Sequence, residues 1–482
     1  MVIRYEPVIG LEVHAQIHTA SKMFCGCPVV ADTGDVPSNT AVCPVCTGMP
    51  GTLPVVNRRA VELTLLTCLA LDCEVPPTAR FARKSYFYPD LPKGYQISQH
   101  ALPFGRDGFL EIETAAGPKR IRINNVHLEE DAGKLYHGAG GSRVDLNRAG
   151  VPLIEIVTEP DLRSVEEVRA YAAALHAVLV YLGVNGGEME RGVMRFEASV
   201  SVRPAGSDAL NPRHEIKNLN SFRALADAVA YEIAAQVETL THGGAVAQQT
   251  VGWDEARGVT YVQRSKEYAE DYRYFPEPDL PPVDVDRAWV AALRAQLPEL
   301  PAARRERFTS DYGLSGYDAA LLTADRAVAD YYEAVVSAGG APKAAANWIT
   351  GELFRLMKET GQTIQTVHVS PQALAELIQL VETDVITLGS GKTVLAEMFA
   401  AGGSARQIVA ARGLAQISDT NALEQVIARI VEENPEEVRQ YLEGKEQILS
   451  WLMGQVMRAT HGKANPQVVQ RLLHVQLEAR RQ

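Results

Sequence analysis

Four of the six cysteines form two close pairs whose spacing suits a metal ion. The pairs are Cys25-x-Cys27 and Cys43-x-x-Cys46, joined by a short loop. Two such pairs can bring four thiolates to the corners of a tetrahedron, the geometry of closed structural Zn²⁺ sites. Because the protein fills all four positions, we expect a structural zinc site. Packed thiols or redox chemistry are the alternatives, and Cys68 and Cys73, in and near an apolar run, are expected to be ordinary buried residues.

Two segments alternate strictly between apolar and polar residues, as a half-buried strand does. In residues 8–18 the apolar side chains share one face, and Glu12 and His14 lie on the other. Residues 193–203 repeat the pattern, with Arg195 on the polar face. A solvent-exposed outer face would explain one such strand, but the repetition favours a sheet with a charged face.

Further carboxylates lie between these two segments. Glu129 and Glu130 are adjacent, and Glu155 interrupts the apolar run 153–157. An unpaired buried carboxylate is costly, so Glu155 needs a cation or a hydrogen-bond donor. A sheet face with carboxylates, a histidine and arginines suits Mg²⁺ and a transferring phosphoryl group. A set of structural ion pairs is the alternative.

The elements that position these groups fall into three regions. A chain of 482 residues is long enough for about three domains. Residues 1–286 have the short alternating runs of an α+β domain, 287–403 have helical spacing, and 404–482 form a small helical tail. In the tail, the stripe Leu423, Val426, Ile427 and Ile430 predicts one helix, and Asn465-Pro466 begins the last one.

Composition excludes several classes of protein. The chain has 47 Lys and Arg residues against 59 Asp and Glu, a net charge of −12, so it does not coat nucleic acid through bulk charge. It has no apolar run of the ~18 residues that a membrane span needs, and no signal segment, so we expect a cytoplasmic protein without a membrane partner. The stretch Gly389–Thr393 resembles the end of a phosphate-binding loop, but isoleucine occupies position 386, where the motif needs glycine. No nucleophile motif is present.

The sequence resembles the B subunits of tRNA-dependent amidotransferases over almost its whole length. The matching stretches are Val8–His14, Cys43–Asn57, Lys84–Ser98, Leu128–Lys134, Asp145–Asp161, Glu215–Phe222, Arg264–Glu267, Asp271–Pro282 and Gly462–Pro466. The resemblance implies a glutamine-synthetase-like fold for the sheet domain, with the zinc knuckle near its N-terminus. It also implies a heterotrimer with a glutaminase A subunit and a small C subunit.

The resemblance further implies a reaction. The B subunit would use Mg-ATP to phosphorylate the side-chain carboxylate of Glu-tRNA(Gln) or Asp-tRNA(Asn), and ammonia from the A subunit would then give Gln-tRNA(Gln) or Asn-tRNA(Asn). Which of the two substrates is used stays open. By position in the motifs, five residues become Mg-ATP candidates: Glu12, His14, Glu129, Glu130 and Glu155. Among these, His14, Glu129 and Glu155 are the candidate magnesium ligands.

Basic residues receive two roles from the same resemblance. Arg148, Arg195 and Lys217 are expected to neutralise phosphate or carboxylate. The tail is expected to bind the tRNA body. Between residues 453 and 482 it holds five basic residues and one acidic residue, Arg458, Lys463, Arg471, Arg480 and Arg481 against Glu478. Of these, Arg458, Lys463 and Arg471 are the tRNA-binding candidates, although a solvated helix face explains the count equally well.

The sequence departs from the family pattern at three positions. Phe196 and Glu197 stand where the family has Cys-Asp, and Ser199 stands where it has Asn. Glu in place of Asp keeps the charge but lengthens the side chain by one methylene, so any contact there must shift. The departures leave a second hypothesis, a non-catalytic tRNA-binding scaffold whose ATP site has been lost.

Overall fold

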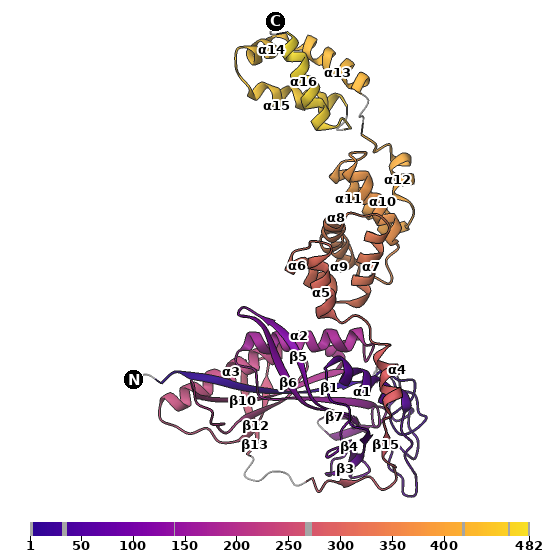
Figure 1. Ribbon diagram of the computed structural model, residues 1–482, viewed down its shortest axis with the longest axis vertical. Helices are drawn as coiled ribbons and strands as arrows, with labels where there is room; N and C mark the ends of the chain where they lie inside the picture. The colour runs from indigo at the N-terminus through magenta and orange to yellow at the C-terminus, as the bar shows by residue number, and fades with distance from the viewer. Residues whose placement is uncertain are drawn as a thin grey trace. The chain divides into compact units, whose positions relative to one another are not determined.

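The computed structural model describes residues 3–30, 36–138, 140–265, 272–416, 420–460 and 463–480. The chain divides into two compact units, residues 1–301 and 302–482. The first is mixed, with a large sheet and helices, and the second is helical (Figure 1). Among the described residues, no helix is both long and apolar enough to cross a membrane.

An eight-stranded sheet organises the first unit, in the order β13-β12-β11-β10-β1-β9-β6-β5. Its strands are β1 (Tyr5–Gln16), β5 (Gly105–Thr114), β6 (Gly117–Glu130), β9 (Pro152–Thr158), β10 (Met194–Pro204), β11 (His214–Leu219), β12 (Gln249–Asp254) and β13 (Val259–Ser265). Neighbouring strands are antiparallel except β11 and β12, which are parallel. Strand β1 therefore lies between β10 and β9. It brings Glu12 and His14 beside the polar residues of those two strands.

The alternation predicted from the sequence is confirmed and sets the two faces of the sheet. On β1 the side chains of Ile9, Leu11 and Val13 are buried, and on β10 those of Phe196 and Ala198 are buried too. This apolar face packs against α1 (Arg58–Ala70), α2 (Val165–Tyr181) and α3 (Phe222–Thr241). Figure 1 shows α2 and α3 lying along one face of the sheet. The polar residues of β1 and β10 therefore face away from the helices.

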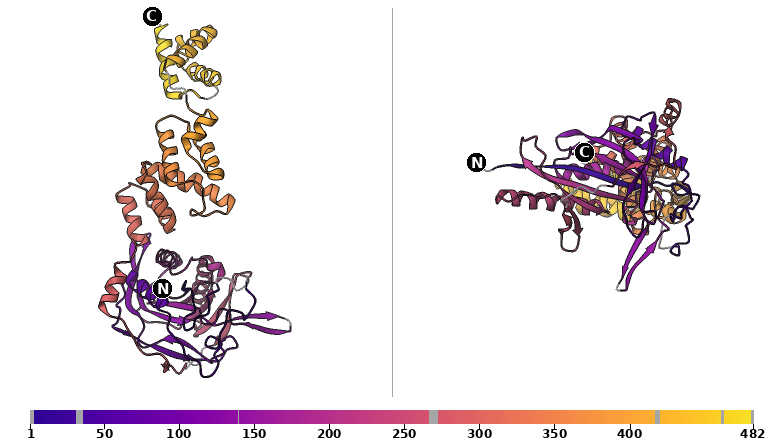
Figure 2. Two further views of the ribbon diagram at one scale, coloured as in Figure 1. Left: turned by 90° about the vertical axis from the view of Figure 1, so that its right-hand side faces the viewer. Right: turned by 90° about the horizontal axis from the view of Figure 1, so that it is seen from below.

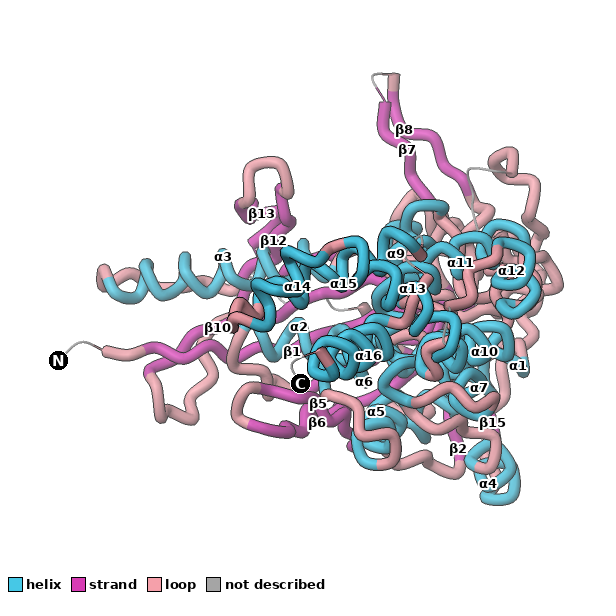
Figure 3. The backbone as a smooth tube through the Cα atoms, turned by 90° about the horizontal axis from the view of Figure 1, so that it is seen from above, coloured by secondary structure: helices cyan, strands magenta, loops and turns pink. Residues whose placement is uncertain are grey.

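Small sheets and a hairpin complete the first unit. They are β2 (Thr78–Ala79) with β15 (Val283–Asp284), β14 (Phe275–Pro276) with β3 (Phe81–Ser85) and β4 (Tyr95–Gln99), and β7 (Lys134–Gly138) with β8 (Gly141–Asp145). The β7–β8 hairpin projects from the body of the unit (Figures 2 and 3). Strand β4 packs against β6, which brings the three-stranded sheet to the acidic end of β6.

Helix α4 (Arg287–Arg294) joins the first unit, although the sequence places the domain boundary before it. Asp286 caps the helix by accepting a hydrogen bond from the Trp289 amide at 2.7 Å. The helix packs against α1, and Leu293 belongs to the core of the sheet domain. Helical spacing is present as expected, but spacing alone does not say which core a helix joins. The first unit thus extends to Pro301.

The described residues of the second unit form two hydrophobic clusters. The first is built by α5 (Pro301–Ser310), α6 (Gly316–Thr323), α7 (Arg326–Ser337), α8 (Pro342–Asn347), a π-helical turn (Trp348–Leu353), α9 (Phe354–Thr360), α10 (Pro371–Glu382), α11 (Leu388–Ala401) and α12 (Ala405–Arg412). The second is built by α13 (Thr420–Glu433), α14 (Pro435–Leu442), α15 (Gln447–Ala459) and α16 (Pro466–Ala479). Because α12 buries Ala405 and Val409 in the first cluster, the tail core begins after the predicted border at 404.

The two helices predicted for the tail are confirmed. Leu423 and Ile427 are fully buried on α13, and Val469 and Leu473 are fully buried on α16. Asn465 caps α16 by accepting hydrogen bonds from two backbone amides.

Candidate functional site

Strands β1, β6 and β9 bring His14, Glu129 and Glu155 together on the polar face of the large sheet. His14 is the register partner of Glu155, and on β6 Glu129 pairs with Leu153 of β9. His14 Nε2 lies 3.1 Å from Glu155 Oε2 and 3.7 Å from Glu129 Oε1. One ligand atom from each of the three residues falls within 4.8 Å of the others, so the group can hold a metal ion. We call these three residues the metal triad.

A second histidine, His127, completes the environment of the triad. It precedes Glu129 by two residues on β6, so both side chains point to the same face. Its Nε2 lies 3.0 Å from Glu155 Oε2, and its Nδ1 is 2.9 Å from the Asn125 side-chain oxygen. Sequence reasoning missed His127, although the two-residue period places it beside Glu129.

The carboxylates of the triad hold both imidazoles in their protonated form. Burial alone would lower the pKa of His14, but the charge and the hydrogen bond of Glu155 outweigh it and raise the pKa to about 9. The same balance raises the pKa of His127 to about 10. Burial would raise the pKa of Glu155, but the two imidazoles keep it well below its ordinary value. A divalent cation would therefore replace the proton of His14.

Lys84, on β3, approaches the same carboxylates and was not assigned a role from the sequence. Burial would lower its pKa, but the charges of Glu129, Tyr274 and Glu155 raise it above the ordinary value. Its Nζ lies 4.9 Å from the ring centre of Tyr272. The lysine thus supplies a positive charge to the carboxylates from the small sheet.

A second acidic cluster lies next to the metal triad, two residues back along β1 from His14. Glu12, Glu197 and Glu215 place one carboxylate oxygen each within 4.8 Å of the others. The Lys217 ammonium forms ion pairs with Glu197 and Glu215. Burial and the neighbouring Glu155 raise the pKa of Glu12. The structure therefore places Glu12 and Lys217, both predicted site residues, together beside the triad.

Arg195 and Arg148 both lie near Asp131. Arg195 is the register partner of His14, and its two terminal nitrogens are each 3.3 Å from an oxygen of Asp131. Arg148 donates to the carbonyl oxygens of Ala132 at 3.0 Å and Gly133 at 2.6 Å. Its Nε is 3.7 Å from Asp131. Arg195 borders the triad, whereas Arg148 is engaged in holding the turn after β6.

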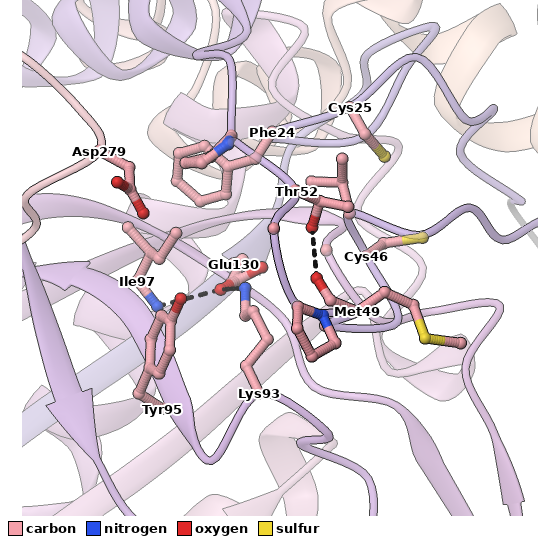
Figure 4. Close-up of a pocket in the computed structure, with 16 residues that line it drawn as sticks. Phe24, Cys25, Cys46, Met49, Thr52, Lys93, Tyr95, Ile97, Glu130 and Asp279 are labelled. Atoms are coloured by element: carbon pink, nitrogen blue, oxygen red, sulfur yellow. Dashed lines mark hydrogen bonds and ion pairs between the residues drawn. The ribbon is translucent and has the colours of Figure 1, made fainter.

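Glu130 is not brought to the triad. Consecutive strand residues point to opposite faces, and Glu130 shares the parity of the core residues Val126 and Leu128. It forms an ion pair with Lys93 and accepts the Ile97 amide at 3.0 Å. These groups line a cavity of about 260 Å³ beside the cysteines (Figure 4).

The four predicted zinc ligands converge. The Sγ atoms of Cys25, Cys27, Cys43 and Cys46 all lie within 4.8 Å of one another, and all four are free of disulfides. A hydrogen bond with Cys25 lowers the pKa of Cys46, and the nearby Lys22 ammonium acts in the same direction. Four cysteine sulfurs at this spacing match the donor set of a closed zinc site, so the residues fit the metal.

Hydrogen bonds tie the cysteine loops to the segment that leads into β9. The fully buried Lys22 donates to the Leu146 carbonyl at 3.3 Å, and its Nζ lies 3.6 Å from Cys46 Sγ. Asn147 accepts from the Ala41 amide at 2.9 Å. Cys68 and Cys73 are buried apart from this group, as expected.

The three residues that depart from the family pattern lie on different faces of the sheet. Phe196 is fully buried on the helix side, 6.1 Å from the ring of Phe222. It does not reach the polar face. Glu197 belongs to the second acidic cluster, and Ser199 lines a hollow beside it.

The candidate tRNA-binding residues lie in the second unit. Arg458, Lys463 and Arg471 are exposed. Arg481, and parts of the matching stretches Arg264–Glu267, Asp271–Pro282 and Gly462–Pro466, lie outside the described residues.

Residues 389–393 lie in the first turns of α11, which follows helix α10. A phosphate-binding loop follows a strand, so the rejection is confirmed.

Comparisons with known proteins agree over both units. Residues 7–291 match the GatB/GatE catalytic domain, and residues 330–477 match the GatB domain. A protein of Roseiflexus sp., named as the B subunit of aspartyl/glutamyl-tRNA(Asn/Gln) amidotransferase, is 52% identical over 480 residues, 98% of each chain. Proteins of the same name from Myxococcus xanthus (52%, 98% of each chain) and Moorella thermoacetica (51%, 98% of this chain and 100% of the relative) are similar at full length. The chain therefore belongs to the family of aspartyl/glutamyl-tRNA(Asn/Gln) amidotransferase B subunits.

Proposed function

We propose that the polar face of the large sheet activates the side-chain carboxylate of a misacylated tRNA. The substrate is Glu-tRNA(Gln) or Asp-tRNA(Asn), Mg-ATP supplies the phosphoryl group, and ammonia then displaces phosphate to give Gln-tRNA(Gln) or Asn-tRNA(Asn). The observation that carries the proposal is the convergence of His14, Glu129 and Glu155 from three strands.

The donor set of the metal triad fits a hard divalent cation. Two carboxylates offer oxygen ligands, and Mg²⁺ in phosphoryl-transfer sites uses few protein ligands and keeps several waters. Glu12 adds a further carboxylate in the neighbouring cluster. These are the residues that would hold the magnesium nucleotide.

The basic residues around the triad would stabilise negative charge. Lys84, Lys217 and Arg195 all carry positive charge close to the carboxylates. Preorganised cations of this kind stabilise charge that develops on a transferring phosphoryl group and on the activated carboxylate. His127 acts through Glu155, which it orients by hydrogen bonding.

The remaining parts of the assembly follow from family membership. A glutaminase A subunit would supply ammonia and a small C subunit would complete a heterotrimer, which agrees with relatives that are named as the B subunit of an amidotransferase. The exposed basic residues Arg458, Lys463 and Arg471 would contact the tRNA body. The four cysteines would bind a structural Zn²⁺, the sheet domain would share the fold of glutamine synthetase, and the enzyme would act in the cytoplasm.

The test supplies Glu-tRNA(Gln) or Asp-tRNA(Asn), ATP, Mg²⁺ and ammonium chloride to the protein together with its A and C partners. Phosphate release that depends on misacylated tRNA supports the proposal. Normal tRNA binding without phosphate release would instead establish the scaffold hypothesis. The retained Glu12, His14, Glu129 and Glu155, and the burial of Phe196 away from the site, favour the catalytic hypothesis.

A further inference from the structure

The side chain of Lys22 is fully buried, a state that lysine rarely adopts in proteins. The residue lies between β1 and the first cysteine pair, and its backbone amide donates to the Cys27 carbonyl at 2.9 Å. The next amide, of Met23, donates to the Gly150 carbonyl at 2.7 Å. The backbone therefore holds Lys22 inside the cysteine loops, where no step of carboxylate activation uses its ammonium.

The buried ammonium has few compensating partners. Its Nζ lies 3.6 Å from Cys46 Sγ and 3.3 Å from the Leu146 carbonyl oxygen. Among the residues that the structure describes, no carboxylate forms an ion pair with it. Glu130 lies close by, but its ion pair is with Lys93. A buried charge is costly unless an opposite charge and hydrogen bonds compensate it, so the ammonium of Lys22 requires a negative centre nearby.

The cysteine cluster can supply that negative centre. The four Sγ atoms lie within 4.8 Å of one another, and binding of Zn²⁺ would convert the thiols to thiolates. Four thiolates outnumber the two charges of the ion, so the filled centre carries two net negative charges. Cys46, the cysteine that Lys22 contacts, is the buried member of the four. An ammonium at this sulfur lowers the net charge of the centre and donates a hydrogen bond to it.

We propose that Lys22 is a positioning residue of the metal centre, which compensates the negative charge of the zinc-bound thiolates through its contact with Cys46. The inference rests on the structural Zn²⁺ of the proposed function and goes beyond it, because it assigns a charge partner outside the four ligands. The ion and the ammonium then depend on each other. Without Zn²⁺ the ammonium loses its counter-charge, and without the ammonium the thiolates keep an uncompensated charge.

The same ammonium joins the metal centre to the segment that leads into β9. Lys22 donates to the Leu146 carbonyl, and the cysteine loops bind the next residue, Asn147, from both sides. The Asn147 side chain accepts from the Ala41 amide and donates to the Pro37 carbonyl, each at 2.9 Å. Lys22 thus contacts the metal centre and this segment with one group.

Two neutral replacements separate the charge of Lys22 from its volume and its hydrogen bonds. Lys22→Met keeps an unbranched stem without a donor, and Lys22→Gln keeps N–H donors without the charge. Either variant tests the proposal if the other fails to fold. Val168→Ala is the matched control, because Val168 is fully buried on α2, outside the cysteine loops, and its truncation lowers stability by leaving a cavity.

The measurement is the zinc dissociation constant of the full chain, obtained by competition with a chromophoric chelator. Both neutral variants should raise this constant at least about tenfold, as expected when a residue that supports a metal ligand is lost. Val168→Ala should leave it within about twofold, since distant sites act independently. Removal of zinc should also lower the melting temperature of the wild-type protein more than that of Lys22→Met, because only the wild-type protein then keeps a buried charge without a partner.

Cobalt(II) in place of zinc gives a signature that a merely structural role would not produce. The positive charge and the hydrogen bond of Lys22 stabilise the electrons of the Cys46 sulfur. The sulfur-to-cobalt charge-transfer band of Lys22→Met should therefore move to longer wavelength. In Val168→Ala the band should stay at the wild-type wavelength.

Three results would overturn the proposal. Unchanged zinc constants and an unchanged cobalt band in both neutral variants would show that the charge of Lys22 has no part in the metal centre, while the zinc assignment stands. Equal weakening by Val168→Ala would trace the effect to general destabilisation. Wild-type protein that binds no zinc would remove the metal centre and the role of Lys22 with it, and would leave carboxylate activation on the sheet untouched.

Discussion

His14 of β1 and Glu155 of β9 are register partners, and their side chains meet with Nε2 3.1 Å from Oε2. The isolated carboxylate in the apolar run of β9 thus has the cationic partner that its burial requires. The same contact fixes both side chains on the polar face.

Glu155→Gln should abolish ammonia-dependent transamidation, with a loss of at least about 10²-fold, because the amide removes a charged metal ligand at constant size. The measurement is amide formation on misacylated tRNA with ammonium chloride as the nitrogen source. The glutaminase activity of the A subunit and the zinc content should be unchanged. Glu111→Gln, an exposed carboxylate on β5, is the control. Unimpaired transamidation by Glu155→Gln would remove Glu155 from the site.

His127→Phe should weaken magnesium binding about 10–100-fold, as expected when a residue that orients a metal ligand is lost. The readout is the Mg²⁺ concentration that gives half-maximal ATP-dependent activity, measured together with the maximal rate at saturating Mg²⁺. Asn125→Ala, which removes only the partner on the far side of the ring, should have a smaller effect. An unchanged magnesium requirement in His127→Phe would show that Glu155 needs no second imidazole.

Cys46→Ser should lower both the zinc content and the melting temperature, because one of four thiolates is replaced by a poorer ligand. Zinc is counted by metal analysis of the purified protein. Cys68→Ala, a buried cysteine outside the cluster, is the matched control and should keep its zinc. A Cys46→Ser protein with a full complement of zinc contradicts the assignment.

The first cluster of the second unit should lose stability in acid through Glu333. Burial opposes the shift, but Arg307 and Arg304 lower the pKa of this carboxyl below its ordinary value of 4.5, and Arg307 Nη1 lies 2.7 Å from it. A carboxyl with a lowered pKa stabilises the fold fully above pH 4.5, and the contribution is lost as pH falls through the lowered value.

Glu333→Gln should therefore cost about 1–3 kcal/mol at pH 7 and much less at about pH 3, measured by urea unfolding. The exposed Glu306→Gln, on the same helix as Arg304, serves as a control and should cost little at either pH. Equal costs of Glu333→Gln at both pH values would contradict the ion-pair explanation.

Replacing Arg458, Lys463 and Arg471 together by Gln should weaken tRNA binding at least about tenfold. It should also make binding less sensitive to salt, by about one unit of log–log slope for each phosphate that the tail no longer neutralises. The control replaces Arg429 and Arg439 by Gln, two exposed tail arginines that lie near glutamates. The same weakening in both variants would indicate a general charge effect.

Much of the site could be predicted from alternation alone. The buried faces of β1 and β10 follow from Ile9, Leu11 and Phe196, and the need of Glu155 for a cation follows from the cost of burying a charge. Because side chains alternate along a strand, the pattern also predicts that Glu129 and Glu130 point to opposite faces of the sheet, although the family motif contains both.

Other contacts depend on how distant segments meet. The charge of Lys84 acts on the triad carboxylates only because the three-stranded sheet packs against β6, and no local sequence pattern predicts that packing. The same holds for α4, whose periodicity predicts a helix but not the core that Leu293 joins. Tertiary packing, rather than local preference, decides these positions.

The position of β1 in the middle of the sheet has a consequence for how the protein acquires its structure. Its hydrogen-bonded neighbours are supplied from far along the chain, as shown by the contacts of Leu11 with Thr158, 147 residues later, and of Val8 with Ser201, 193 residues later. Pairings of such separation close slowly. Until they close, the chain presents a long strand with one apolar face and both edges bare, so refolding from denaturant should be slow and prone to aggregation at high protein concentration.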